Sequence, residues 1–242
     1  MNRSSYISLV TGGTRGIGAE IVAVLRNRGD KVFTISRREG KTSDHISMDL
    51  SSKEQISRLA KRIGRRKIDN LIFCHRYRGD SFSEELQITF QSVHQVVNCL
   101  KSRFSKKSSI VIVSSVASQF IIDEQSFAYH GTRAALENLS RYLTVNFGPK
   151  GIRCNCVMPT TLIKSENKHF FTKNNPVRKL LEDITPLRRM GNASDIAHLC
   201  EFLCSDKASF ISGQSITVDG GLSVVSQETI ARRLTDLSHP TS

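Results

Sequence analysis

A glycine-rich run near the N-terminus has the composition of a phosphate-binding loop. It reads Thr11-Gly12-Gly13-Thr14-Arg15-Gly16-Ile17-Gly18 and lies between an apolar, strand-like run and a helical pattern. At such a junction the backbone must turn sharply, and glycine lets it approach a pyrophosphate whose charge the helix N-terminus stabilises. A plain glycine turn would have the same composition, but the position after a strand and before a helix favours a dinucleotide site.

Arginines follow the second strand-like run, where dinucleotides are told apart. The segment is Ser36-Arg37-Arg38. An NAD site ordinarily has an acid here that accepts hydrogen bonds from the ribose hydroxyls, and a carboxylate would repel a 2′-phosphate. Arg37 and Arg38, together with Arg15, could instead pair with that phosphate. Unless these arginines are merely solvated, the sequence predicts NADP (NADPH) in preference to NAD.

Strand-like and helical patterns alternate along the chain. Apolar runs cover residues 7–10, 32–35, 71–73, 110–113, 154–158 and 215–218, and helical patterns cover residues 17–27, 53–62, 86–104, 128–147 and 194–204. Short apolar runs are typical of buried parallel strands, and the alternation implies right-handed crossovers. We predict one α/β domain, a Rossmann-type doubly wound parallel sheet in three αβα layers. Its ligand should lie beyond the carboxyl ends of the strands.

Length and composition exclude several classes of protein. The 242 residues suit one α/β domain. No apolar stretch is long enough to span a membrane, and the N-terminus has no apolar signal-peptide core, so we expect a cytoplasmic protein. The six cysteines match no zinc spacing and should be reduced packing residues. A net charge of +13 would attract nucleic acid, but the basic clusters lack interleaved aromatics and a recognised motif, so nucleic acid is not expected as a partner.

These features together resemble the short-chain dehydrogenase/reductase family. The glycine run has that family's T-G-x-x-x-G-x-G spacing, and Asp49-Leu50, after a third strand, is similar to its adenine-contacting Asp-Val pair. Further segments in the family's register are Pro186-Leu187-Arg188-Arg189-Met190-Gly191, Ile211-Ser212-Gly213-Gln214 and Val218-Asp219-Gly220-Gly221. The resemblance covers residues 6 to about 223. It implies hydride transfer between NADP(H) and a small ketone or secondary alcohol.

The resemblance also implies a catalytic set. In the family a serine orients the substrate oxygen, a tyrosine exchanges the proton, and a lysine four residues later holds the ribose and favours the ionised tyrosine. Ser115 and Tyr129 match the serine and the tyrosine. Arg133 stands at the lysine position, and Thr89 stands where the family has the asparagine that anchors a relay water. Arginine keeps the charge, but its bulk and planar fork make this exchange non-conservative.

Further cofactor-side positions depart from the family. Phe73-Cys74-His75-Arg76 replaces an Asn-Asn-Ala-Gly segment that packs closely on the cofactor, and Lys164 replaces a threonine that contacts the cofactor amide. His75 is either another acid–base group or a structural histidine. Beyond the glycine loop and Ser36, Arg37 and Arg38, the resemblance implies cofactor contacts at Asp49, Leu50, Cys74, Tyr129, Arg133, Pro159 and Leu162.

Two functions therefore remain open. Ser115 and Tyr129 favour an active oxidoreductase, whereas Arg133, Thr89 and the segment 73–76 favour a catalytically impaired relative that serves as a nucleotide-binding sensor or as an assembly subunit. Residues 160–185 are expected to form a substrate lid. Residues 1–223 should form the NADP-binding domain and residues 224–242 a C-terminal extension.

The resemblance also predicts a homodimer or homotetramer. The helical patterns 86–104 and 128–147 correspond to the family's dimerisation helices, and both carry apolar residues in excess of what one sheet face is expected to cover. These are Val93, Val96, Val97 and Leu100 on the first and Leu136, Leu139, Leu143 and Val145 on the second.

Overall fold

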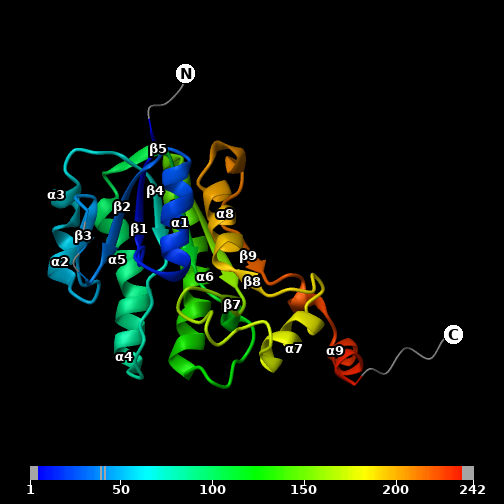
Figure 1. Ribbon diagram of the computed structural model, residues 1–242. Helices are drawn as coiled ribbons and strands as arrows, with labels where there is room; N and C mark the ends of the chain where they lie inside the picture. The colour runs from blue at the N-terminus through cyan, green and yellow to red at the C-terminus, as the bar shows by residue number, and fades with distance from the viewer. Residues whose placement is uncertain (1–4, 39, 41, 236–242) are drawn as a thin grey trace.

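A seven-stranded parallel sheet forms the centre of the computed structural model, which describes residues 5–38, 40 and 42–235 (Figure 1). The strands lie in the order β3-β2-β1-β4-β5-β6-β9, and every neighbouring pair is parallel. They are β1 (Ile7–Thr11), β2 (Lys31–Ser36), β3 (His45–Ser47), β4 (Ile68–Phe73), β5 (Phe104–Val113), β6 (Arg153–Pro159) and β9 (Ser215–Val218). The strand order reverses between β1 and β4, where a doubly wound sheet binds its ligand.

Helices cover both faces of this sheet, as Figure 1 shows. The helices α1 (Gly16–Asn27) and α8 (Ala193–Leu203) cover one face, and α2 (Lys53–Ser57), α3 (Leu59–Ile63), α5 (Ser92–Leu100) and α6 (Phe127–Phe147) cover the other. Successive strand residues point to opposite faces, so Leu71 joins the core under α5 and α6 while Ile72 joins the core under α1 and α8. The predicted three-layer, doubly wound fold is confirmed.

The bounds predicted for the long helix over residues 86–104 are wrong at both ends. It begins earlier, as α4 (Phe82–Glu85), continues through a π-helical turn, η1 (Leu86–Gln91), and ends with α5 at Leu100. Phe104 is the first residue of β5, where it pairs with Ile68 and is buried. The polar residues 105–109 hid the start of this strand, because their composition is that of a loop. The helix predicted over residues 53–62 is interrupted at Arg58.

Most apolar residues that we took as dimerisation signals belong to the monomer's own core. Val93, Val96, Val97, Leu100, Leu136, Leu139 and Leu143 are all buried against the sheet. Only Val145 is exposed, at 75% of its surface. The expectation that these residues exceed what the sheet covers is therefore wrong, because one face of a wide sheet accommodates both helices.

Several elements beyond the predicted pattern extend the fold. A small two-stranded sheet joins β7 (Leu162–Ile163) to β8 (Gly191–Asn192). Between them lies α7 (Pro176–Ile184), and α9 (Gln227–Leu234) packs against it. Figure 1 shows α7 and α9 projecting together away from the sheet, at the lower right. The short 3-10 helices are η2 (Val116–Ser118), η3 (Gly148–Lys150), η4 (Asp206–Ala208) and η5 (Leu222–Val224).

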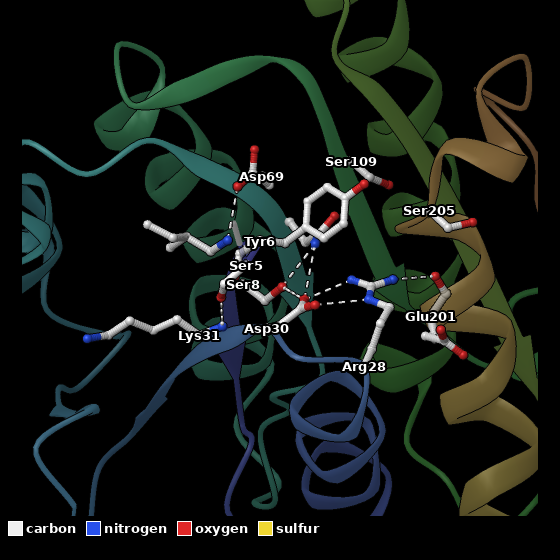
Figure 2. Close-up of polar contacts among 12 residues, drawn as sticks. Ser5, Tyr6, Ser8, Arg28, Asp30, Lys31, Asp69, Ser109, Glu201 and Ser205 are labelled. Carbon is white, nitrogen blue, oxygen red and sulfur yellow. Dashed lines mark hydrogen bonds and ion pairs between the residues drawn. The ribbon is translucent and has the colours of Figure 1, made fainter. Parts of the chain in front are cut away.

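A buried acid fastens the sheet at the amino ends of its strands (Figure 2). The carboxylate of Asp30, just before β2, accepts hydrogen bonds from Arg28 at 2.8 and 2.9 Å and from the Ser8 hydroxyl of β1. Arg28 also donates to the carbonyl of Glu201 in α8, at 3.0 Å. A buried charge requires such partners. This network lies at the opposite end of the strands from the expected ligand site and is structural.

The cysteines are in the state that the sequence predicts. All six cysteines are free thiols, and Cys154, Cys156, Cys200 and Cys204 are buried, as expected for packing residues. Within the described ranges, no helix has the length and apolar character needed to cross a bilayer.

Candidate functional site

A cavity of about 260 Å³ opens at the carboxyl ends of the central strands. All the predicted site residues line it except Gly16 and Thr89. The predicted residues that line the cavity are Gly12, Thr14, Arg15, Ile17, Gly18, Ser36, Arg37, Arg38, Asp49, Leu50, Cys74, Ser115, Tyr129, Arg133, Pro159 and Leu162. The fold thus brings the glycine loop and the implied catalytic residues, far apart in sequence, into one site.

Two glycines of the loop, Gly12 and Gly18, leave no room for a side chain at their positions. A Cβ added to Gly12, whose φ is +69°, would lie 2.8 Å from the backbone nitrogen of His75, and one on Gly18 would overlap the carbonyl oxygen of Gly12. At the N-cap of α1, Arg15 makes no side-chain hydrogen bond to the helix, so the amides of the first turn remain available to a ligand. This cradle fits the diphosphate of a dinucleotide.

The arginines after β2 are held at the other end of the cavity. Arg37 and Arg38 are exposed and line it. The Nε2 of His45 donates to the carbonyl of Arg38 at 2.8 Å, which fixes the turn. Arg15 lines the same cavity from the glycine loop. All three arginines therefore line the cavity, where an anionic ligand could reach them.

Ser115 and Tyr129 reach the cavity from neighbouring elements. Ser115 lies two residues after β5 and caps η2, its Oγ accepting from the amide of Ala117 at 3.1 Å. Tyr129 lies in the first turn of α6, which Ser126 caps by accepting from the amide of Tyr129. The Ser114 hydroxyl donates to the carbonyl of Arg133 at 2.9 Å, which ties the end of β5 to α6.

Arg133 is buried in a pair with an acid that the sequence did not single out. Its guanidinium carbon lies 4.6 Å from the centroid of the Tyr129 ring, and its Nη2 lies 3.3 Å from Oε1 of Glu85. The same oxygen accepts from the hydroxyl of Thr132 at 2.8 Å. The two charged side chains are only 3% and 6% exposed. No motif or spacing marks Glu85, because it meets Arg133 only through the fold.

Burial has a cost for this arginine. It lowers the pKa of Arg133 below its ordinary value, and Tyr129 and Glu85 partly oppose that shift. Its Nε is buried without an acceptor among the described residues. The guanidinium thus depends strongly on Glu85 and on the face of the Tyr129 ring.

His75 joins the glycine loop to the helix behind it. Its Nε2 donates to the carbonyl of Ile88 at 2.9 Å and lies 2.8 Å from the Ser92 hydroxyl, and its Nδ1 accepts from Oγ1 of Thr11 at 2.7 Å. Burial, with a contribution from the charge of Arg133, lowers the pKa of His75 to about 4. Both ring nitrogens are engaged and the ring is neutral, which is the structural alternative considered for it.

Thr89 does not line the cavity. It is buried, and its Oγ1 accepts from the amide of Tyr77 at 3.2 Å, while its neighbour Ile88 lines the cavity. The π-helical turn η1 changes which residue faces inward.

The remaining exception, Gly16, is covered by a carboxylate. A Cβ added to Gly16 would lie 2.7 Å from Oε1 of Glu166, which also lies 3.7 Å from Arg78. Burial would raise the pKa of Glu166, but hydrogen bonds and the charges of Lys164 and Arg78 outweigh it and hold the pKa below its ordinary value. The chain's own anion thus lies beside the glycine cradle.

Comparison with known proteins adds to this geometry. A protein-family model described as enoyl-(acyl carrier protein) reductase matches residues 12–223. A tropinone reductase homolog of Arabidopsis thaliana is 30% identical, over 90% of this chain and 92% of its own length.

Solved structures show the same similarity. The aldohexose dehydrogenase of Thermoplasma acidophilum, in ligand-free form, superposes with a TM-score of 0.82 at 25% identity, over 92% of this chain and 96% of its own. A Pseudomonas aeruginosa RhlG/NADP active-site complex superposes with a TM-score of 0.79 at 27% identity, over 90% and 96%.

Proposed function

Because the chain belongs to the short-chain dehydrogenase/reductase family, whose members bind a nicotinamide cofactor, we propose that it interconverts a small ketone and the corresponding secondary alcohol with NADP(H). The observation that carries the proposal is the single cavity lined by the glycine loop, Ser115, Tyr129 and Arg133. A neighbour solved as an NADP complex supports the nucleotide class.

The chain's residues would hold the cofactor along the cavity. The glycine loop and the start of α1 suit the diphosphate, and Arg15, Arg37 and Arg38 suit the 2′-phosphate. Asp49 and Leu50 would contact the adenine, as the family resemblance implies. When bound, the nicotinamide supplies or accepts the hydride.

The chain itself supplies the proton. In the reducing direction the Ser115 hydroxyl orients the carbonyl oxygen, and the Tyr129 hydroxyl gives it a proton as the carbonyl carbon is reduced. The phenolate left behind regains its proton from solvent. The guanidinium of Arg133, 4.6 Å from the ring centroid, stabilises that phenolate by its charge. Glu85 keeps the guanidinium in place.

Nucleotide binding is the first test of this proposal. NADPH should bind more tightly than NADH when each is titrated by fluorescence. Replacing both Arg37 and Arg38 by alanine should weaken NADPH at least about tenfold and NADH much less, because charge-assisted hydrogen bonds to phosphate are lost. Arg26→Ala, an exposed arginine of α1 outside the cavity, serves as the control. Equal affinities of the unmodified protein for the two nucleotides would contradict NADP preference.

Turnover is the second test. Tyr129→Phe should lower kcat for carbonyl reduction by about 10²–10⁴-fold while leaving NADPH affinity nearly unchanged, since it removes only the proton donor. Tyr142→Phe, on the exposed side of the same helix, should have little effect. A protein that binds NADPH and reduces nothing across a broad carbonyl panel would instead support the impaired relative.

A further inference from the structure

Two cations that line the cavity form no close ion pair in the described part of the chain. Arg76 follows β4, and Lys164 follows β7; both line the cavity together with Tyr129. Two neighbouring cations do form ion pairs, Arg133 with Glu85 and Arg78 with Glu166. Arg76 and Lys164 therefore add positive charge to the cavity that no carboxylate of the described residues contacts directly.

These two side chains lie close to the proton-transfer residues. Burial, followed by the charge of Arg76, lowers the pKa of Lys164, while Glu166 and Tyr129 act in the opposite direction. Arg76 also contributes to the lowered pKa of Arg133. Glu166 offsets only part of the burial of this ammonium and makes no close ion pair with it, and the neighbouring guanidinium adds repulsion. An anion between the two would relieve both costs.

The cofactor's own phosphates have other partners in this cavity. The glycine loop and the amides at the start of α1 suit the diphosphate, and Arg15, Arg37 and Arg38 suit the 2′-phosphate. Lys164, by contrast, lies close enough to Tyr129 for their charges to interact. A cation at that place meets whatever group lies beside the reacting oxygen.

We propose that Arg76 and Lys164 bind an oxyanion carried by the substrate, a carboxylate or a phosphate, next to its reacting carbonyl. The substrate class is then an acidic carbonyl compound, such as an oxo acid, or the corresponding hydroxy acid in the oxidising direction. This inference rests on the proposed function, because it places the anion beside the proton donor of that reaction.

Binding to the NADPH-saturated protein tests the inference without turnover. Malonate and, separately, inorganic phosphate are titrated by calorimetry, so the two arms tell carboxylate from phosphate. At least one should bind, and Lys164→Met or Arg76→Gln should weaken it about tenfold or more. Lys168→Met, an exposed lysine in the same loop outside the cavity, should leave the affinity unchanged. Lysine and methionine have similar volumes, so folding should persist and can be checked by circular dichroism.

A matched substrate pair gives the kinetic arm. Acetoacetate carries a negative charge that its methyl ester lacks, and the ester adds only a methyl group, so the acid should have the higher kcat/KM. Lys164→Met should remove most of that preference, mainly through the KM of the acid.

Each contrary result has its own meaning. If NADPH displaces both anions, Arg76 and Lys164 serve the cofactor's diphosphate and the inference is overturned. Equal losses in Lys164→Met and Lys168→Met, or no anion binding to the NADPH-bound protein, also overturn it while leaving the proposed function intact. Failure to bind NADPH would instead overturn the proposed function and this inference with it.

Discussion

At the scale of single residues, the buried charge of Arg133 is balanced by Glu85. A lysine at this position would carry a compact ammonium, whereas the guanidinium of an arginine has five hydrogen-bond donors and stays protonated. Glu85 supplies the missing counter-charge from another helix. The ion pair between Glu85 and Arg133 therefore holds the guanidinium beside the Tyr129 ring.

A double-mutant cycle measures this pairing. Removing one partner of a buried ion pair leaves the other charge uncompensated, so Glu85→Gln or Arg133→Met alone should lower the free energy of unfolding by about 3–5 kcal/mol. The double variant should lose clearly less than the sum, as judged by urea denaturation. Glu54→Gln, which breaks the exposed pair with Arg58, is the control and should cost far less.

The same pair can be tested in catalysis. If the guanidinium is a working substitute for lysine, Arg133→Lys should preserve or raise the kcat for carbonyl reduction.

The double-mutant cycle also has a contrary outcome. Additive losses of unfolding free energy would mean that the contact between Glu85 and Arg133 contributes nothing, and Glu85 would then have no positioning role.

The lowered pKa of His75 predicts how the free energy of unfolding depends on pH. Its pKa in the folded chain is about 4, below the ordinary value of 6.5, so the unfolded chain binds more protons below pH 6.5. The contribution of His75 to the free energy of unfolding is therefore complete above pH 6.5 and is lost as the pH falls toward 4. Between pH 7 and pH 5 this amounts to about 2 kcal/mol.

His75→Gln should flatten that dependence. Urea denaturation of the unmodified and substituted proteins at pH 7 and at pH 5 would measure the difference, with the exposed His169→Gln as the control. The same pH dependence in His75→Gln and in the unmodified protein would show that the ring is not held neutral by the fold.

At the scale of elements, the sequence predicted what periodicity and glycine chemistry can encode. The glycine loop and the central strands follow from local patterns, whereas Ser115, Tyr129 and most other residues around the cavity were implied by the family resemblance. The π-helical turn that contains Thr89 and the start of β5 at Phe104 do not follow from local patterns, because each depends on contacts with distant segments. Glu85 and Glu166 were missed for the same reason, since an acid on a helix or in a loop carries no signal of its partner.

The pairing of α7 with α9 gives a prediction at this scale. The two helices contact one another, and Arg233 of α9 donates to the carbonyl of Ile184 at the end of α7, at 2.8 Å. Neither helix has a fully buried residue. Deleting residues 227–242 should therefore speed hydrogen exchange in residues 176–184 while leaving the Tm of the domain nearly unchanged.

A shorter deletion controls for this effect. Removing only residues 236–242 keeps α9 and should leave exchange in residues 176–184 as it was. If α7 is equally protected in both truncated proteins, α9 does not support it, and residues 224–242 have another role.

At the scale of the whole molecule, little of the surface that the sequence indicated for association is left exposed. Once the core residues of α5 and α6 are accounted for, Tyr142 and Val145 remain exposed, at 55% and 75%. They lie on α6, and Tyr142 borders a hollow that Phe90 and His94 also line. Members of the family are typically oligomeric, and this side of α5 and α6 is the one that the family resemblance implicates.

We therefore expect a homodimer or homotetramer with Tyr142 and Val145 in its interface. Sedimentation at micromolar concentration should give a multiple of the 27.0 kDa monomer mass. Replacing both residues by aspartate should yield monomers, because a stable interface does not tolerate unpaired charges in its centre. Val177→Asp, on the exposed side of α7, is the control and should sediment like the unmodified protein.

Charge adds a second, independent signature of that association. Each protomer carries a net charge of +13, so two copies repel one another at low ionic strength. At about 0.1 M salt the Debye length is only about 10 Å, and most of this long-range repulsion is screened. Raising the salt concentration should therefore strengthen self-association, the opposite of what an interface held by ion pairs would show. A monomer at every salt concentration would contradict the assembly, and oligomers that persist in the double aspartate variant would move the interface to another face.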